Sequence, residues 1–136
     1  MYEYNVKVLR VIDGDTIDVD IDLGFSTVLK KKRIRLYGID TPESRTSDKE
    51  EKIRGIISKN YLLTKCPIGK YIRLKSHGVG KFGRILGELF EYNETSSIND
   101  EMCNEAYAVP YHGQSKEEIK QLHLENRQKL ISKGLL

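Results

Sequence analysis

Alternating apolar and polar side chains mark the first third of the chain as strand-forming. Positions 4–12 are rich in β-branched and apolar residues, and beyond a turn signal at 13–15 apolar residues alternate with aspartates. Alternation with a period of two is typical of a strand with one dry and one wet face. After a glycine-containing break, a further extended run covers 27–37. We therefore expect a three-stranded antiparallel meander whose second strand exposes three aspartates to solvent: Asp18, Asp20 and Asp22.

Helical periodicity replaces this pattern after the polar stretch at 44–47. Apolar residues then recur about once per turn, up to a Cys-Pro pair at 66–67 that ends the pattern. Such spacing predicts an amphipathic helix. We expect its buried stripe to consist of Ile53, Ile56, Ile57 and Tyr61.

The second half of the chain adds further strands and helices. Residues 71–76 and 84–90 have the composition of strands and are joined by a glycine-rich turn, and residues 97–106 predict a short helix. Ser115 followed by Glu118 is a capping-box signature that opens a last helix. Five strands with about three helices predict an α+β protein with a mainly β core, built as a five-stranded closed barrel of the oligonucleotide-binding type (OB-fold).

The length of the chain favours one domain. With 136 residues, of which 38% are hydrophobic, the chain can bury a real core, and no repeat or linker divides it. We expect a single domain over 1–136. No apolar run is long enough to span a bilayer, and the N-terminus lacks the pattern of a leader. We therefore expect a monomer that does not engage a membrane and works in the cytoplasm, with a secreted mature form as the alternative.

The net charge of +3 allows a nucleic-acid partner without arguing strongly for one. Basic residues crowd into one predicted strand, and such a cluster has two interpretations. It could be a footprint for the phosphate backbone, or a solvated strand edge that lysines protect against aggregation. The cluster consists of Lys30, Lys31, Lys32, Arg33 and Arg35.

Two short strings carry residues suited to phosphodiester chemistry: VIDGDT at 11–16 and RLYGIDTPE at 35–43. Carboxylates hold a hard cation and activate a water, while a guanidinium neutralises a phosphate. Two acidic ligands would leave coordination positions for waters and a substrate oxygen. The candidate residues are Asp13, Asp15, Arg35, Asp40, Thr41 and Glu43.

A third string, KFGR at 81–84, supplies a second arginine. Arg35 and Arg84 could each grip a phosphate through forked donors, and Glu43 could act as a general base or orient the attacking water. Taken singly, each residue has a plainer explanation: an acidic turn for DGD, a helix N-terminal charge for the glutamate, and a solvated side chain for either arginine. The ordered set is what favours chemistry.

Histidines and tyrosines carry weaker signals. The histidines at 77, 112 and 123 have no metal-ligand spacing, so no role is assigned to them. Tyr107 and Tyr111 could stack on a base, although an aromatic residue is more often part of a core.

The strings VIDGDT, RLYGIDTPE and KFGR, in this order, resemble the staphylococcal nuclease family. The segment AVPYHG at 108–113 resembles a family segment that precedes the last helix. The resemblance extends from about Val6 to the final helix. It implies an oligonucleotide-binding barrel with three helices.

For the cation, the resemblance implies Ca²⁺ bound by the side chains of Asp15 and Asp40 and by the backbone carbonyl of Thr41. Asp13 takes the place of a nearby supporting carboxylate. Mg²⁺ or Mn²⁺ are alternative ions, because free Ca²⁺ is usually scarce in a cytoplasm.

For the reaction, the resemblance implies that Glu43 activates or positions water and that Arg35 and Arg84 contact the scissile phosphate. The implied reaction breaks the bond to the 5′ oxygen and leaves 3′-phosphate ends.

For the substrate, the resemblance implies contacts from Lys81, Phe82 and Tyr111. Phe82 stands where the family commonly has a tyrosine whose hydroxyl helps to hold a terminal phosphate, so one phosphate contact is expected to be missing. The loop that follows Glu43 is shorter than in the secreted prototype, which predicts a different product length or strand preference.

We therefore expect a Ca²⁺-dependent nuclease that hydrolyses DNA, with RNA as a second candidate, and that favours single strands because a barrel groove admits unstacked bases. The alternative is a non-catalytic OB-fold module that binds nucleic acid. A protein-interaction domain would explain the basic strand but would leave the carboxylates and the second arginine as coincidence.

Overall fold

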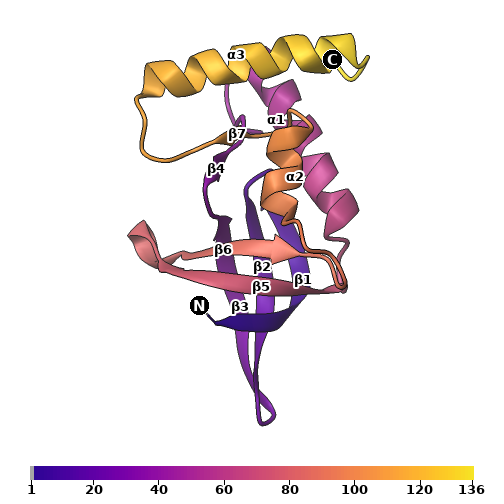
Figure 1. The fold of residues 1–136 in the computed structure, drawn as a ribbon, viewed down its shortest axis with the longest axis vertical. Coiled ribbons are helices and arrows are strands. Elements are labelled where there is room, and N and C mark those ends of the chain that lie inside the picture. Colours follow the sequence, from indigo (N-terminus) through magenta and orange to yellow (C-terminus); the bar gives the residue numbers. More distant parts are fainter. Residues whose placement is uncertain (1) are drawn as a thin grey trace.

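A closed five-stranded barrel forms the lower part of the molecule (Figure 1). The computed structural model describes residues 2–136. The first three strands pair antiparallel, as predicted, and the barrel closes in the order β1-β2-β3-β6-β5, with β3 and β6 parallel. The predicted α+β fold class and barrel are confirmed. The strands are β1 (Glu3–Asp13), β2 (Thr16–Gly24), β3 (Thr27–Leu36), β5 (Tyr71–Val79) and β6 (Ile85–Phe90).

Three helices gather at the opposite end of the molecule from the β2–β3 hairpin, and α3 crosses above the others in Figure 1. Between the barrel and α3 lies a small antiparallel sheet of two short strands that the sequence patterns do not predict. Within residues 2–136 no helix has the length and apolar character needed to cross a membrane. The remaining elements are β4 (Ile39–Asp40), α1 (Lys49–Lys65), the 3₁₀ turn η1 (Lys81–Gly83), α2 (Ile98–Asn104), β7 (Val109–Pro110) and α3 (Lys116–Ser132).

Side chains from the inner faces of the strands fill the barrel, and residues of α1 and α2 close one end of it. Burying a large aliphatic side chain contributes about 1.5–3 kcal/mol, so this cluster is the main source of stability. The barrel therefore gives the strand ends a rigid frame. The fully buried side chains include Val6, Val8, Ile17, Val19, Ile34, Leu36, Leu62, Ile72, Leu74, Leu89, Ile98 and Met102.

The predicted helix α1 is present, but its predicted buried stripe is wrong at two of its four positions. Ile53 and Ile56 are 51% and 40% exposed. The buried face consists of Arg54, Gly55, Ser58 and Leu62. Small residues occupy this face because α1 packs closely against the chain that follows β4. Ile57 and Tyr61 of the predicted stripe are partly buried, so the apolar period alone locates the buried side of this helix only in part.

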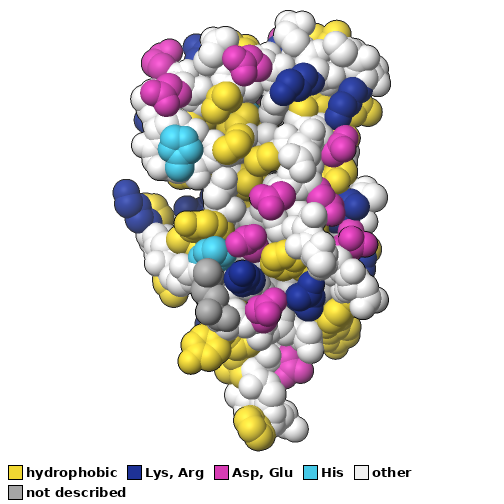
Figure 2. Space-filling model, viewed as in Figure 1, with side chains coloured by type: hydrophobic (Ala, Val, Ile, Leu, Met, Phe, Trp, Pro, Cys, Tyr) yellow, Lys and Arg dark blue, Asp and Glu magenta, His cyan; other side chains and the backbone are white. Residues whose placement is uncertain are grey.

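The prediction that Asp18 faces solvent is also wrong. The residue is 3% exposed, and its carboxylate accepts hydrogen bonds from Nε of Arg33 at 2.9 Å and from Nη2 at 3.2 Å. Asp20 accepts from the backbone N–H of Lys31 and lies 3.5 Å from Nζ of Lys30. Basic side chains of β3 thus neutralise the aspartates on the outer face of β2. Figure 2 shows acidic and basic side chains interspersed on the visible surface of the molecule. Part of the basic cluster is structural, which weakens its interpretation as a phosphate footprint.

The Asp18–Arg33 pair predicts a pH-dependent stability. The hydrogen bonds from Arg33 hold the pKa of Asp18 below its usual value of 3.8. The pair therefore stabilises the fold at neutral pH, and its contribution is lost as the pH falls below 3.8 through the lowered pKa. Arg33→Met should lower the free energy of unfolding by about 1–2 kcal/mol at pH 7, because a buried carboxylate loses its partner. Urea unfolding at pH 7 and pH 3 checks this, and a deficit of equal size at both pH values would contradict it.

Candidate active site

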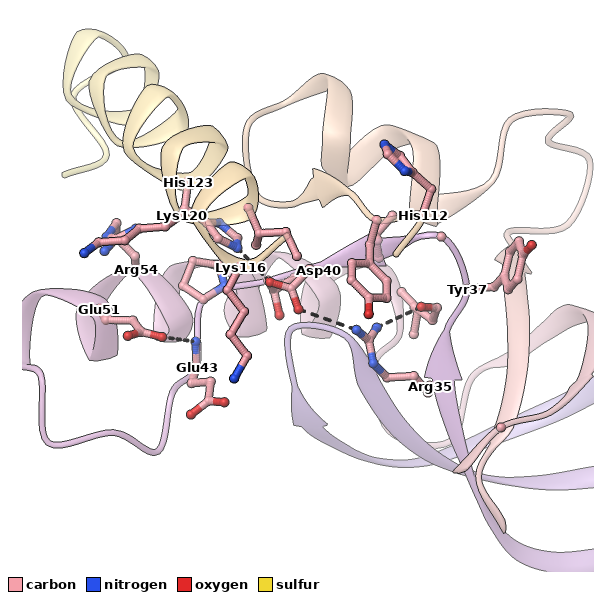
Figure 3. Close-up of a pocket in the computed structure, with 18 of the residues that line it drawn as sticks. Arg35, Tyr37, Asp40, Glu43, Glu51, Arg54, His112, Lys116, Lys120 and His123 are labelled. Atoms are coloured by element: carbon pink, nitrogen blue, oxygen red, sulfur yellow. Dashed lines mark hydrogen bonds and ion pairs between the residues drawn. The ribbon is translucent and has the colours of Figure 1, made fainter. Parts of the chain in front are cut away.

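An open pocket lies where one end of the barrel meets α1, β4 and α3 (Figure 3). The end of β3, the segment after β4 and the turn before β6 line one side, and α3 contributes lysines and a histidine to the other. The predicted site residues that line it are Arg35, Asp40, Thr41, Glu43, Lys81, Arg84 and Tyr111. Residues of RLYGIDTPE and KFGR therefore meet in one pocket, whereas Asp15 of VIDGDT does not line it and reaches the site through its contact with Arg35.

Two carboxylates converge on one guanidinium. Nη1 of Arg35 lies 3.4 Å from Oδ2 of Asp15, and Nη2 lies 3.6 Å from Oδ1 of Asp40. Asp15 comes from the β1–β2 turn, and its backbone carbonyl accepts a hydrogen bond of 2.8 Å from the N–H of Leu36, next to Arg35 in β3. The pairing of β2 with β3 thus holds Asp15 beside Arg35, and Arg35 in turn contacts Asp40.

Burial raises the pKa of Asp15 above its usual value. The neighbouring carboxylates Asp13 and Asp40 raise it further, against the opposing effects of Arg35 and of a hydrogen bond from Thr16. A buried carboxylate beside others is costly to ionise, and a cation held between them relieves that cost. The electrostatics of the site therefore favour a bound positive charge.

The donor set suits a hard divalent cation. Asp15 and Asp40 offer carboxylate oxygens, and the buried hydroxyl of Thr41 has no hydrogen-bond partner within residues 2–136. Across this part of the chain, no three or more His, Cys, Asp and Glu side chains are grouped as a metal site. A cation here would complete its shell with carbonyl, water and phosphate oxygens, which is usual for Ca²⁺ and Mg²⁺. The residues present fit such an ion.

Close packing of α1 holds the segment after β4 in place. A Cβ atom on Gly55 would lie 2.4 Å from the backbone carbonyl of Glu43, so a glycine is needed at this contact. Gly14 fits between Thr41 and Ser58 in a similar way, with a Cβ position 2.8 Å from the Cβ of Ser58. The side chain of Glu43 is exposed, while its N–H donates to the carboxylate of Glu51 at 3.2 Å. The backbone of Glu43 is thus held in place, while its carboxylate is exposed at the pocket.

Arg84 lines the pocket from the turn between β5 and β6. It precedes β6, whose Ile85 pairs with Ile34 of β3, so Arg84 lies near Arg35. Within residues 2–136 its buried Nε has no hydrogen-bond partner, and its guanidinium makes no ion pair. A half-buried arginine without a counter-charge is suited to bind an anion.

Asn99 ties β6 to the segment that directly follows β3. Its Nδ2 donates to the carbonyl of Tyr37 at 2.9 Å and to that of Gly87 at 3.1 Å, and its Oδ1 accepts from the N–H of Leu89. The amide therefore bridges the point where β3 and β6 separate. Sequence reasoning missed this residue, although a polar side chain between the buried Ile98 and Met102 of a short helix was an available signal.

His123 was also missed. Its Nε2 lies 2.8 Å from Oδ2 of Asp40, and the ring projects from α3 toward that carboxylate in Figure 3. The two residues are 83 positions apart, so no local spacing reveals the contact.

The other predicted residues lie further from the centre. Asp13 accepts a hydrogen bond from Gly14 within its own turn and does not line the pocket. Phe82 is 93% exposed, has a φ of 63° and lies outside the pocket lining. Tyr107 stacks on Tyr61 with ring centroids 4.2 Å apart, so it packs against the core, and it does not line the pocket.

The fold and the site together define an oligonucleotide-binding-type barrel with carboxylates and arginines gathered at one end. The family described as staphylococcal nuclease homologue matches residues 33–135, and the chain belongs to this family.

Curated proteins of this kind are similar to the chain over stretches of different length. The chain is 34% identical over 116 residues to endonuclease YhcR of Bacillus subtilis, which covers 80% of this chain and 9% of that protein. It is 28% identical over 142 residues to protein ParB of Escherichia coli, covering 95% of this chain and 71% of ParB. It is 50% identical over 42 residues to the thermonuclease of Staphylococcus hyicus, covering 31% of this chain and 21% of that enzyme. The chain thus spans only a small part of the first and third of these relatives.

The contact between α1 and Glu43 predicts an unusual cost for a glycine-to-alanine change in a helix. Alanine favours helices, but at position 55 its Cβ would collide with the backbone of Glu43 and Ser44. Gly55→Ala should therefore destabilise the protein by about 1–3 kcal/mol through overpacking. Thermal unfolding measures the effect, with the exposed neighbour Ile56→Ala as the control on the same helix. A Gly55→Ala protein as stable as the wild type would show that the segment moves freely away from α1.

Proposed function

We propose that the chain is a divalent-cation-dependent phosphodiesterase that hydrolyses DNA, with RNA as a second substrate. The observation that carries the proposal is the convergence of Asp15 and Asp40 on Arg35, beside a pocket that Glu43 and Arg84 also line. Ca²⁺ is the proposed ion, and Mg²⁺ and Mn²⁺ are the alternatives. The endonuclease and thermonuclease names of relatives support the same class of reaction.

Asp15, Asp40 and the carbonyl of Thr41 would hold the cation, with Asp13 as a supporting charge. When bound, a divalent ion polarises a phosphoryl oxygen and lowers the pKa of a coordinated water. The protein supplies the rigid positions of the two carboxylates, which come from the β1–β2 turn and from β4.

Glu43 is the proposed general base. Its carboxylate is exposed at the pocket, whereas its backbone is fixed by Gly55 and by the Glu51 carboxylate. A base held in this way can accept a proton from the attacking water, and general-base catalysis contributes about 10²–10⁴ in rate. The water oxygen then bonds to phosphorus, the bond to the 5′ oxygen breaks, and that oxygen takes up a proton. The products are a 3′-phosphate and a 5′-hydroxyl.

Arg35 and Arg84 are the proposed phosphate contacts. Both guanidinium groups line the pocket, one beside the carboxylates and the other with a buried, unpartnered Nε. Forked donors aimed at the phosphate stabilise the charge that localises on its oxygens in the transition state. Lysine would supply the charge without the fork.

The pocket also suggests how a strand binds. Lys81 and the α3 residues Lys116 and Lys120 place positive charge around it, and Tyr111 is 44% exposed on its wall. Exposed aromatic rings stack unpaired bases, so a single strand is the favoured substrate. Phe82 lacks a hydroxyl and lies outside the lining, so we assign it no phosphate contact. Because β1 to α3 supply every proposed part, we propose that 1–136 acts as one nuclease domain.

The proposal is tested by incubating the purified chain with end-labelled single-stranded DNA and RNA in Ca²⁺, Mg²⁺, Mn²⁺ or EDTA. We expect cleavage in at least one of these ions, none in EDTA, and fragments with 3′-phosphate ends. Fragments with 5′-phosphate ends would refute the direction of cleavage. Binding of oligonucleotides without turnover in any ion would instead establish a non-catalytic nucleic-acid-binding module.

Substitutions at the proposed base and phosphate contact give a sharper prediction. Glu43→Gln should lower kcat by about 10²–10⁴ while leaving oligonucleotide affinity nearly unchanged, because the lost interaction belongs to the transition state. Arg35→Lys should lower kcat as well, since the fork is lost. The control is Glu117→Gln, an exposed change at the start of α3. Single-turnover kinetics on proteins with wild-type circular dichroism checks this, and robust turnover by Glu43→Gln would remove the proposed base.

A further inference from the structure

The Asp40 carboxylate is held from two sides. Oδ1 lies 3.6 Å from Arg35, while Oδ2 accepts a hydrogen bond of 2.8 Å from Nε2 of His123. The His123 side chain is only 13% exposed, and it reaches Asp40 from α3, a different element from those that carry Asp15, Arg35 and Asp40. Figure 3 shows the imidazole and the guanidinium approaching the carboxylate from opposite directions.

Packing does not require a histidine at this position. α3 is anchored elsewhere, through the buried Leu130 and through Asn126, whose Nδ2 donates to the carbonyl of Ala108 at 2.9 Å. The imidazole instead directs a donor at one particular carboxylate oxygen, which suggests that its effect is on Asp40.

That hydrogen bond restricts how Asp40 can bind an ion. Because Oδ2 accepts a hydrogen bond from His123, the carboxylate cannot rotate freely. Oδ1 then faces Arg35, which also contacts Asp15. A ligand whose orientation is fixed before binding loses less entropy when the ion arrives. Groups that hydrogen-bond to metal ligands commonly account for about 10–100-fold in metal affinity.

We propose that His123 is a positioning residue that orients Asp40 toward the cation and thereby couples the docking of α3 to cation binding. The proposal rests on the proposed function, because it takes Asp40 to be a cation ligand. Coupling between two sites is reciprocal. A bound cation should therefore hold the N-terminal half of α3 more tightly, just as the docked helix should strengthen binding of the cation.

Calorimetric titration of the nucleic-acid-free protein with Ca²⁺ and Mn²⁺ tests the proposal without an activity assay. His123→Leu should weaken affinity for the cation about tenfold or more. His123→Gln, whose amide can still donate to Asp40, should recover most of that loss. Leu130→Val loosens the same helix but keeps the hydrogen bond to Asp40, so it should lower Tm and weaken the affinity of the folded protein much less than His123→Leu does.

Amide hydrogen exchange of α3 provides the second readout. Ca²⁺ should slow exchange over residues 116–126 in the wild type and have little effect there in His123→Leu. If His123→Leu binds the ion as tightly as the wild type, or if Leu130→Val weakens binding equally, His123 is only a structural contact and the proposal fails while the proposed function stands. If the wild type binds none of the ions, the proposed cation site fails, and the role of His123 fails with it.

Discussion

The contact of Arg35 with Asp15 and Asp40 is the constraint on which the rest of the site depends. Two carboxylates and a supporting aspartate repel one another, and burial raises the cost of ionising Asp15. Only a rigid frame keeps such groups together. The barrel provides it, because Arg35 pairs with Thr16 in the β2–β3 register and its neighbour Leu36 hydrogen-bonds to the Asp15 carbonyl. The hydrophobic core thus maintains an electrostatic arrangement that would otherwise separate.

Around this centre, unusually small or polar buried residues hold the other reactive groups. Gly55 lets α1 touch the backbone of Glu43, and Asn99 bridges β3 and β6 near the two arginines. His123 brings α3 to Asp40. Each of these contacts joins a helix either to the barrel or to the segment that contains and follows β4. The helices therefore do more than cover the core, since they set the positions of catalytic candidates that the strands alone would leave loose.

Much of the fold could be predicted from the sequence because the barrel strands carry regular signals. Alternation, turn glycines and the capping box at Ser115 are local, and they identify the barrel strands and the three helices. The strings around Asp15, Arg35 and Arg84 likewise identify the family. The two-residue strands β4 and β7 are too short to produce a period, and they form only because the barrel and α3 bring them together.

The remaining errors share one physical cause: the relevant partner is distant in sequence. Asp18 is buried because Arg33 lies opposite it on β3, and α1 buries its small face because of Glu43. The link between His123 and Asp40 crosses most of the chain. Local patterns describe an element's own faces, but they do not show which face a neighbour covers.

The most direct test of the account is the position of the cation itself. Crystals soaked in CaCl₂ and measured near the calcium absorption edge would show the ion by its anomalous scattering. We expect one ion bonded to carboxylate oxygens of both Asp15 and Asp40, at the roughly 2.3–2.6 Å usual for Ca²⁺. An ion bound to only one of these residues, or found elsewhere on the protein, would contradict the account.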